Sequence, residues 1–144
     1  MASLTMSRSE REAFLAETHV GMVAVAESGR GPLTVPVWYR YAPGDEVCFV
    51  TGANSRKAKL IRQANRIGFC VQTETAPYKY VSIEGPATLG EVNYERDVRA
   101  VAIRYLGEQM GEMYLAMMAN DPEPTVLVSL KPARWYSVDY SKLG

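Results

Sequence analysis

The chain has 144 residues, of which 47% are hydrophobic, and its 16 basic and 16 acidic side chains give a net charge of zero. This length fits one domain with its own core, so we expect a single domain over residues 1–144. The zero net charge argues against a nucleic-acid-binding protein, which needs excess cations. No apolar run approaches the roughly 20 residues that cross a bilayer, and no apolar signal segment begins the chain. We therefore expect a cytoplasmic protein that binds neither nucleic acid nor membrane.

Histidine and cysteine are too few and too scattered for the common metal sites. The one histidine is His19, and the two cysteines are Cys48 and Cys70. None of the usual zinc-ligand spacings occurs, so no metal site is expected. Both cysteines lie in apolar, strand-like segments and are expected to be reduced core residues. His19 could serve as a catalytic residue or a haem ligand only with partners that the sequence does not indicate.

Periodicity and turn residues divide the chain into short strands and a few helices. Ser7 and Glu10 form a capping-box pattern that predicts the start of a helix. Pro36 removes a backbone donor from a strand, which indicates a sheet edge, a bulge or backbone that faces something other than a neighbouring strand. In chain order we expect a helix at 7–17, strands at 21–27, 33–41 and 47–51, a helix at 54–66, strands at 67–73 and 78–89, helical structure at 94–120 and a strand at 126–138.

Short connections between successive strands favour an antiparallel sheet, and the six strands with their helices indicate an α+β fold, with a strand count that fits a small barrel. Helical region 94–120 is expected to be two helices divided near Gly107 or Gly111. The last strand is expected to be interrupted around Lys131 and Pro132.

The segment from 47 to 73 contains five cations and no carboxylate. Arg56 and Lys57 fall in the first turn of the helix predicted at 54–66, where the helix dipole already presents positive charge. Cations are favourable there if an anion binds to the free N–H groups, the Ser55 hydroxyl and the two side chains. Phosphate is the natural candidate. The alternative is a solvated basic face, which is the commoner interpretation for Arg62 and Arg66.

Aromatic residues on two predicted strands give a second candidate surface. Trp38 and Tyr39, next to Pro36, could line a flat heteroaromatic ligand, or could fill the core or an oligomer interface. Tyr78 and Tyr80 share one face of their strand because strand side chains alternate. They could form a ligand wall or a subunit contact.

These elements resemble the split-barrel family of pyridoxamine 5′-phosphate oxidase-like flavoproteins. Within it, the chain is similar to the flavin/deazaflavin oxidoreductase branch of actinobacteria, which uses the deazaflavin coenzyme F420. The resemblance covers nearly the whole chain, and its most specific part is Thr51 followed by Ser55, Arg56 and Lys57. It rests on GMVAVA, VPVWYRY, VCFVTGANSRKAKLIRQANRIGFCV and YVSIEGPATL. The implied fold is a six-stranded, mainly antiparallel split β-barrel with flanking helices.

The resemblance also implies a homodimer with two cofactors at its interface, and roles for individual residues. Some would hold the cofactor phosphate, and a strand would run along the isoalloxazine-type ring with its backbone bonding the polar edge of the ring. The implied phosphate residues are Ser55, Arg56 and Lys57 with Thr51 beside them, the ring residues are Val35, Pro36, Val37 and Trp38, and the candidates for the substrate pocket are Tyr78 and Tyr80.

The implied activity is reduction of an unsaturated or conjugated small molecule by hydride from reduced F420, with no catalytic side chain identified. The last strand contains Arg134–Trp135–Tyr136 and lacks the Arg-x-His substrate motif of pyridoxamine phosphate oxidases, so the resemblance implies a reductase. Two alternatives are an FMN-binding oxidoreductase of the same fold and a non-catalytic module that binds a cofactor or haem.

Overall fold

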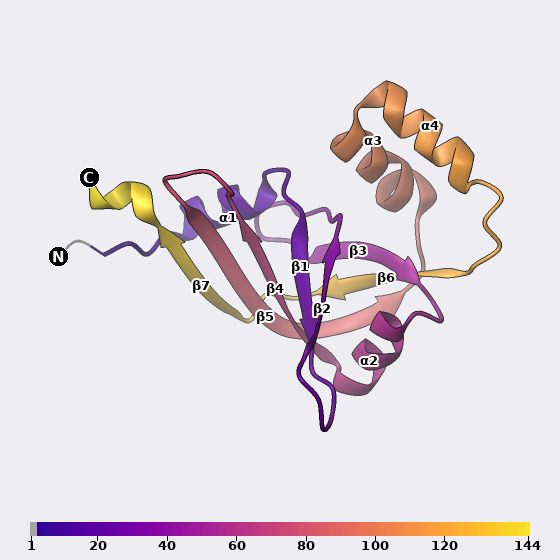
Figure 1. Ribbon diagram of the computed structural model, residues 1–144, viewed down its shortest axis with the longest axis horizontal. Coiled ribbons are helices and arrows are strands. Elements are labelled where there is room, and N and C mark those ends of the chain that lie inside the picture. Colours follow the sequence, from indigo (N-terminus) through magenta and orange to yellow (C-terminus); the bar gives the residue numbers. More distant parts are fainter. Residues whose placement is uncertain (1–2) are drawn as a thin grey trace.

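The computed structural model describes residues 3–144, and it confirms an α+β fold built on an antiparallel sheet that forms a half-barrel (Figure 1). Helix α1 lies against the sheet, α2 packs beside the far end of β5, and α3 and α4 form a hairpin at the opposite end of the molecule from the two termini (Figure 1). The helices are α1 (Arg8–Ala16), α2 (Arg56–Ala64), α3 (Ala100–Leu106) and α4 (Glu108–Met118). The strands are β1 (Gly21–Val25), β2 (Leu33–Val37), β3 (Val47–Gly52), β4 (Arg66–Gln72), β5 (Lys79–Gly90), β6 (Thr125–Leu130) and β7 (Arg134–Asp139).

Both predicted helix starts are confirmed. The Ser7 side chain accepts the N–H of Glu10, and the Glu10 carboxylate accepts the N–H of Ser7, which completes the capping box of α1. Ser55 caps α2 by accepting the N–H of Ala58. Asn65 ends α2 in the left-handed conformation, with φ of 56°, and its N–H donates to the carbonyl of Ile61. Strand β4 begins at the next residue, so a tight cap leads the chain directly from helix to sheet.

The sheet has the strand order β2-β1-β4-β5-β6-β3, with β7 paired to β5 outside this path. Strands β1 and β2 form the predicted hairpin, in which Met22 lies opposite Pro36. Strand β2 has no second neighbour, so the sheet-edge interpretation of Pro36 is confirmed. The strand ends at Val37 rather than continuing to Tyr41 as predicted. Beyond it, only an isolated bridge between Arg40 and Cys48 joins this segment to β3.

The segment predicted as one interrupted strand at 126–138 forms two strands with different partners. Strand β6 pairs with β3 and the second half of β5, whereas β7 pairs with the first half of β5. Gly85 lies where the β6–β7 connection crosses β5, and a Cβ at this position would overlap the carbonyl of Lys131. Glycine is therefore a steric requirement at this position of the continuous strand β5, since only glycine admits the crossing loop.

The helical region begins with a π-helical turn, η1 (Tyr94–Arg99), that leads directly into α3. Gly107 separates α3 from α4 with φ of 83°, so the predicted division occurs at this glycine. Gly111 instead lies buried in the α3–α4 contact, where a Cβ would press on Ile103. No helix in residues 3–144 is long and apolar enough to cross a membrane.

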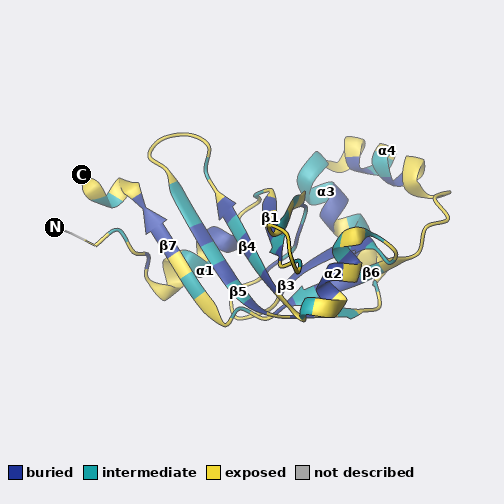
Figure 2. Cartoon of the chain, turned by 60° about the horizontal axis from the view of Figure 1, so that its bottom comes forward, coloured by how far each residue is buried: buried dark blue, intermediate teal, exposed yellow. Residues whose placement is uncertain are grey.

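The core lies between α1, α2 and the concave face of the half-barrel, where buried residues alternate along the strands (Figure 2). Tyr39 is the largest fully buried side chain, and its hydroxyl donates to the Leu15 carbonyl at 2.6 Å. Both cysteines are free, and Cys48 is buried. The ring of His19 packs on Phe14, and its Nε2 lies 2.9 Å from the Phe14 carbonyl. His19 therefore joins a helix end to the core.

Candidate functional site

A pocket of about 460 Å³ lies at the seam of the half-barrel, where the edge of β2 approaches β3 and the helical region covers a third side. This volume is within the range of small-molecule sites, about 300–1,000 Å³. Its lining residues are Val20, Pro36, Val37, Trp38, Phe49, Val50, Lys57, Asp97, Val98, Val101, Ala102 and Tyr114.

Edge backbone borders this pocket. Because β2 pairs only with β1, alternate residues of β2 direct backbone groups away from the sheet. Pro36 contributes no donor there, so a neighbouring chain could not extend the sheet at this point without losing a hydrogen bond. Below the pocket, reciprocal backbone bonds of 2.9 and 3.1 Å between Arg40 and Cys48 close the seam. The end of the open edge, at Pro36 and Val37, therefore borders the pocket.

Trp38 forms the aromatic wall of the pocket. Its ring lies nearly parallel to that of Tyr105 on α3, with 5.2 Å between ring centres and 7° between planes. The ring of Trp38 also lies beside that of Tyr114 on α4, with 5.3 Å between ring centres. The Tyr105 hydroxyl is fixed in turn, because it donates to the His19 carbonyl at 2.6 Å and accepts the N–H of Tyr39. The indole plane is thus set by α3 and by the strand segment together.

Lys57 is the cation of the pocket. It lies in the first turn of α2 and is partly buried, and this burial lowers the pKa of its ammonium group. No carboxylate in residues 3–144 forms an ion pair with Lys57. The positive end of α2 adds to the same positive potential. Lys57 therefore keeps a charge that an incoming anion would stabilise.

Arg56, its neighbour, is already partnered. Its guanidinium donates to both oxygens of Glu27, just after β1, and its side chain is half exposed. This ion pair supplies the anion that the first turn of α2 requires, so Arg56 at this position is explained within the chain. Its predicted contact with a cofactor phosphate stays a prediction, and it would compete with Glu27.

Thr51 and Ser55 lie side by side as predicted, but they do not line the pocket. Their hydroxyl oxygens are 3.2 Å apart, and Ser55 already accepts the N–H of Ala58. Ser55 thus has a structural role as the cap of α2. A further contact of either hydroxyl with a phosphate is untested.

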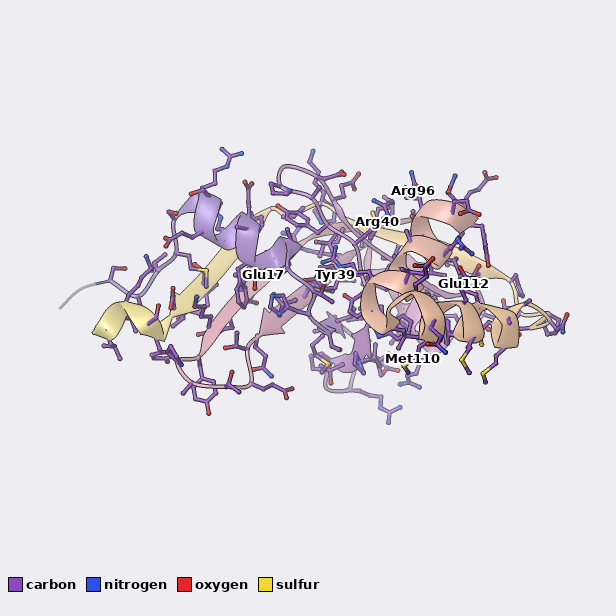
Figure 3. All side chains as sticks on the ribbon, turned by 90° about the horizontal axis from the view of Figure 1, so that it is seen from above. Glu17, Tyr39, Arg40, Arg96, Met110 and Glu112 are labelled. Carbon is purple, nitrogen blue, oxygen red and sulfur yellow. The ribbon has the colours of Figure 1, made fainter. Side chains whose placement is uncertain are left out.

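Asp97 is a buried carboxylate at the opposite wall, in the π-helical turn η1. Arg40 and Arg96, labelled side by side in Figure 3, donate to it at 2.8 and 2.9 Å, and the Asn93 N–H donates at 2.8 Å. Burial would raise the pKa of Asp97, but these bonds from Arg96, Asn93 and Arg40 outweigh it and hold the pKa at about 2. The carboxylate therefore stays ionised and fixes η1 to the strand segment at Arg40.

Of the residues predicted from the sequence, the pocket brings together Pro36, Val37, Trp38 and Lys57. The other predicted site residues, which do not line it, are Val35, Thr51, Ser55, Arg56, Tyr78 and Tyr80. Tyr78 is exposed, and Tyr80 packs against Tyr136 of β7, on the part of β5 away from α3 and α4 (Figure 1). Their contact with substrate stays a prediction that would need a second copy of the chain.

Sequence reasoning missed the wall formed by η1, α3 and α4. Asp97 pairs with Arg40 across 57 positions of the chain, and no local pattern indicates such a contact. Val101 and Ala102 look like ordinary core positions of a helix. The one available signal is Asn93, a cap residue four positions before Asp97.

Comparison with known proteins places this geometry in a family. The family described as pyridoxamine 5′-phosphate oxidase matches residues 7–139. No curated protein matches the chain. Among solved structures, the conserved hypothetical protein Rv2991 from Mycobacterium tuberculosis is 28% identical, with a TM-score of 0.79 over 100% of this chain and 91% of that one.

Two more distant structures share the fold. An FAD-binding protein from Mesorhizobium loti is 18% identical, with a TM-score of 0.63 over 92% of this chain and 93% of that one. An F420 reductase is 15% identical, with a TM-score of 0.59 over 87% and 94% of the two chains. The family match covers nearly all of the described residues and agrees with the half-barrel. The chain belongs to the pyridoxamine 5′-phosphate oxidase family.

Proposed function

We propose that the chain is an oxidoreductase that uses the deazaflavin coenzyme F420 to reduce an unsaturated or conjugated small molecule. The observation that carries the proposal is Lys57, an unpaired and partly buried cation that faces the same pocket as the flat indole wall of Trp38. A ring with an anionic arm matches both features. The fold is shared with an F420 reductase, which supports this choice of cofactor.

The pocket fits such a group on physical grounds. Trp38, Phe49 and Val101 offer an apolar surface on different sides, and the β2 edge that ends at Pro36 and Val37 offers outward-facing backbone without a strand partner at alternate residues. Lys57 would hold the phosphate, with the first N–H groups of α2 beside it. When bound, the reduced deazaflavin ring supplies a hydride to the substrate.

The protein residues then act by placement. Trp38, held by Tyr105, would orient the ring plane, and the apolar wall would exclude water from the reacting face. Asp97 stays ionised at neutral pH and both of its oxygens accept hydrogen bonds, so it acts as a positioning residue for η1 rather than as a proton donor.

We also propose a homodimer that completes the site. The helical wall is covered on one side only: Met110, Met113 and Met117 follow one another along α4 at helical spacing, and Met117 is 80% exposed. Met110, labelled beside α4 in Figure 3, and Met113 are also largely exposed. Val20, on the pocket rim, is also 56% exposed. An apolar surface that continues from a pocket rim is typical of an interface.

A flavin is the second candidate cofactor, because the same fold occurs in an FAD-binding protein and the pocket features suit FMN equally. Haem is disfavoured as the ligand of His19, since its Nε2 contacts the Phe14 carbonyl and its ring is largely buried against Phe14.

Titration of the purified protein with oxidised F420 and, separately, with FMN tests the proposal by cofactor fluorescence. Preferential binding of F420, followed by oxidation of reduced F420 in the presence of an electron-poor alkene, supports it. Preferential binding of FMN would keep the site and replace the cofactor. Binding of neither would overturn the proposal.

A further inference from the structure

A second pocket, of about 410 Å³, lies on another part of the molecule and shares no lining residue with the first. Helix α1, the turn between β2 and β3, and the β6–β7 connection with the start of β7 form its walls. The rings of Trp135 and Tyr41, both of which line the pocket, lie edge to face with 6.5 Å between ring centres. None of the residues assigned to the cofactor site contributes to it.

Arg11 is the residue that this pocket leaves unexplained. Its guanidinium carbon lies 4.5 Å from the ring centre of Trp135, so the cation stacks on the indole. Its Nε is buried and has no hydrogen-bond partner in residues 3–144. The two acids beside it in the sequence have other partners: Glu12 pairs with Arg8 at 3.5 Å, and Glu10 pairs with Lys142 at 3.0 Å. A buried donor without an acceptor costs free energy. Because this Nε has no accessible surface, a ligand in the pocket would meet the outer nitrogens of the guanidinium group.

The charges around Arg11 restrict what that ligand can be. Lys131 adds positive charge at the β6–β7 connection, and Asp45 and Glu46 add negative charge on the turn. On the α1 side, the lining residues Arg8 and Glu12 offset each other as an ion pair. A single anionic group would lie against the guanidinium fork, which matches a carboxylate in geometry. A second negative charge on the ligand would face the acidic turn. The volume also exceeds that of a lone ion, so the remainder of the ligand would occupy the space beside Tyr41 and Trp135.

We propose that this second pocket binds a small organic monocarboxylate, with its carboxylate on Arg11. The site is independent of the proposed cofactor, because no residue is shared.

Proton–nitrogen NMR of the full chain tests the assignment directly, because the Nε–Hε pair of Arg11 gives its own signal. The probes are sodium carboxylates from acetate to benzoate, with succinate and inorganic phosphate as more highly charged anions. We expect a saturable shift of the Arg11 signal with a monocarboxylate, and weaker binding of succinate and phosphate. Arg104, whose Nε is also buried without a partner but which lies outside this pocket, is the internal control and should not shift.

Arg11→Lys keeps the charge and removes the fork, so the affinity followed at the Trp135 indole N–H should fall about tenfold. Arg30→Lys, at an exposed arginine outside this pocket, is the matched control and should leave the affinity unchanged. Shifts that do not saturate with any carboxylate, equal shifts at Arg11 and Arg104, or tighter binding of phosphate would each overturn the proposal. The wild-type titration decides the question even if Arg11→Lys does not fold. Binding of F420 should be unaffected by a saturating carboxylate, so failure here is distinguishable from failure of the proposed function.

Discussion

Trp38 and Tyr39 are neighbours in the sequence, yet they belong to two regions with opposite properties. Tyr39 points into the half-barrel, where it is fully buried, contacts Phe69 edge to face and donates its hydroxyl to a helix carbonyl. Trp38 points into the seam pocket and remains partly exposed. In the interior, each polar group on Tyr39 has a partner. In the pocket, the partly buried Lys57 has no ion-pair partner among residues 3–144.

The contrast between Tyr39 and Trp38 separates a region whose contacts stabilise the fold from a region whose groups remain available to bind a ligand. Closing the interior removes apolar surface from water, which stabilises the fold. Leaving a partly buried cation in the pocket costs free energy in the absence of an anion. Variants in the two regions should therefore separate stability from binding.

The largest effect is expected in the interior. Phe69 is almost fully buried against Tyr39 and fills the space above Gly21. Phe69→Ala should lower the free energy of unfolding by about 3–5 kcal/mol, because it removes buried surface and leaves a cavity. Urea unfolding measures this. Tyr136→Ala, at a largely exposed ring, is the control and should cost less than about 1 kcal/mol. Equal losses would show that the interior is not the stabilising region.

Asp97 joins the two regions, since it fixes the pocket wall to the strand segment. Asp97→Asn should lower the free energy of unfolding by about 2–3 kcal/mol at neutral pH, because Arg40 and Arg96 lose their charged acceptor. The folded pKa of Asp97, about 2, lies below the unfolded value of about 3.9. Its stabilisation is therefore present above about pH 4 and is lost as the pH falls toward 2.

Urea unfolding between about pH 5 and 2 checks this dependence. The wild-type protein should lose the stabilisation over that interval, and Asp97→Asn should lack that part of the decline. Asp121→Asn, at an exposed acid, should follow the wild-type curve. A wild-type decline that survives in Asp97→Asn would place the acid sensitivity elsewhere.

The same division explains what the sequence could predict. Alternating burial, caps and turn residues are local signals, so the helix start at Ser7, a helix beginning near residue 54 and the adjacent strands β1 and β2 were predictable, and a sheet edge was one of three interpretations of Pro36. The early end of β2 at Val37 was not, because it depends on where β3 approaches. Nor was the separate pairing of β6 and β7, which depends on contacts with both halves of β5.

Within the site, the local charge pattern singled out Lys57, which lines the pocket, and its contact with a phosphate stays a prediction. The pattern could not show that Arg56 pairs with Glu27, 29 positions earlier. The contact of Trp38 with Tyr105 was equally beyond local patterns. Residues that face one another across the seam come from distant segments, so their spacing in the sequence carries no signal.

Substitutions in the pocket are expected to change cofactor affinity rather than the free energy of unfolding. Lys57→Met should weaken binding of the anionic cofactor by about 1.5–3 kcal/mol, the range for hydrogen bonds to charged groups. Burial lowers the pKa of Lys57, so the charged ammonium group costs free energy in the folded protein. Removing that charge should leave the melting temperature of the cofactor-free protein unchanged or raised.

Cofactor fluorescence titration and a thermal melt of the same sample measure both effects. Lys59→Met, at an exposed position of the same helix, is the matched control and should leave affinity nearly unchanged. A clear fall in the melting temperature of Lys57→Met would show instead that Lys57 is structural.

The smallest effect is expected at Glu27, and it decides the role of Arg56. The Arg56–Glu27 pair is half exposed on the arginine side, so Glu27→Gln should change the free energy of unfolding by no more than about 1 kcal/mol. The same substitution releases Arg56 from its internal anion. If Arg56 contributes to phosphate binding, cofactor affinity should rise about two- to fivefold at low salt and less at high salt, because salt screens an exposed charge.

Titrations at two salt concentrations measure this change in affinity. Glu84→Gln is the control, since the Glu84 carboxylate pairs with Arg66 and Arg134 away from the pocket. Unchanged affinity would show that Arg56 does not bind the phosphate. Lys57 would then be the cation that distinguishes the pocket from the interior.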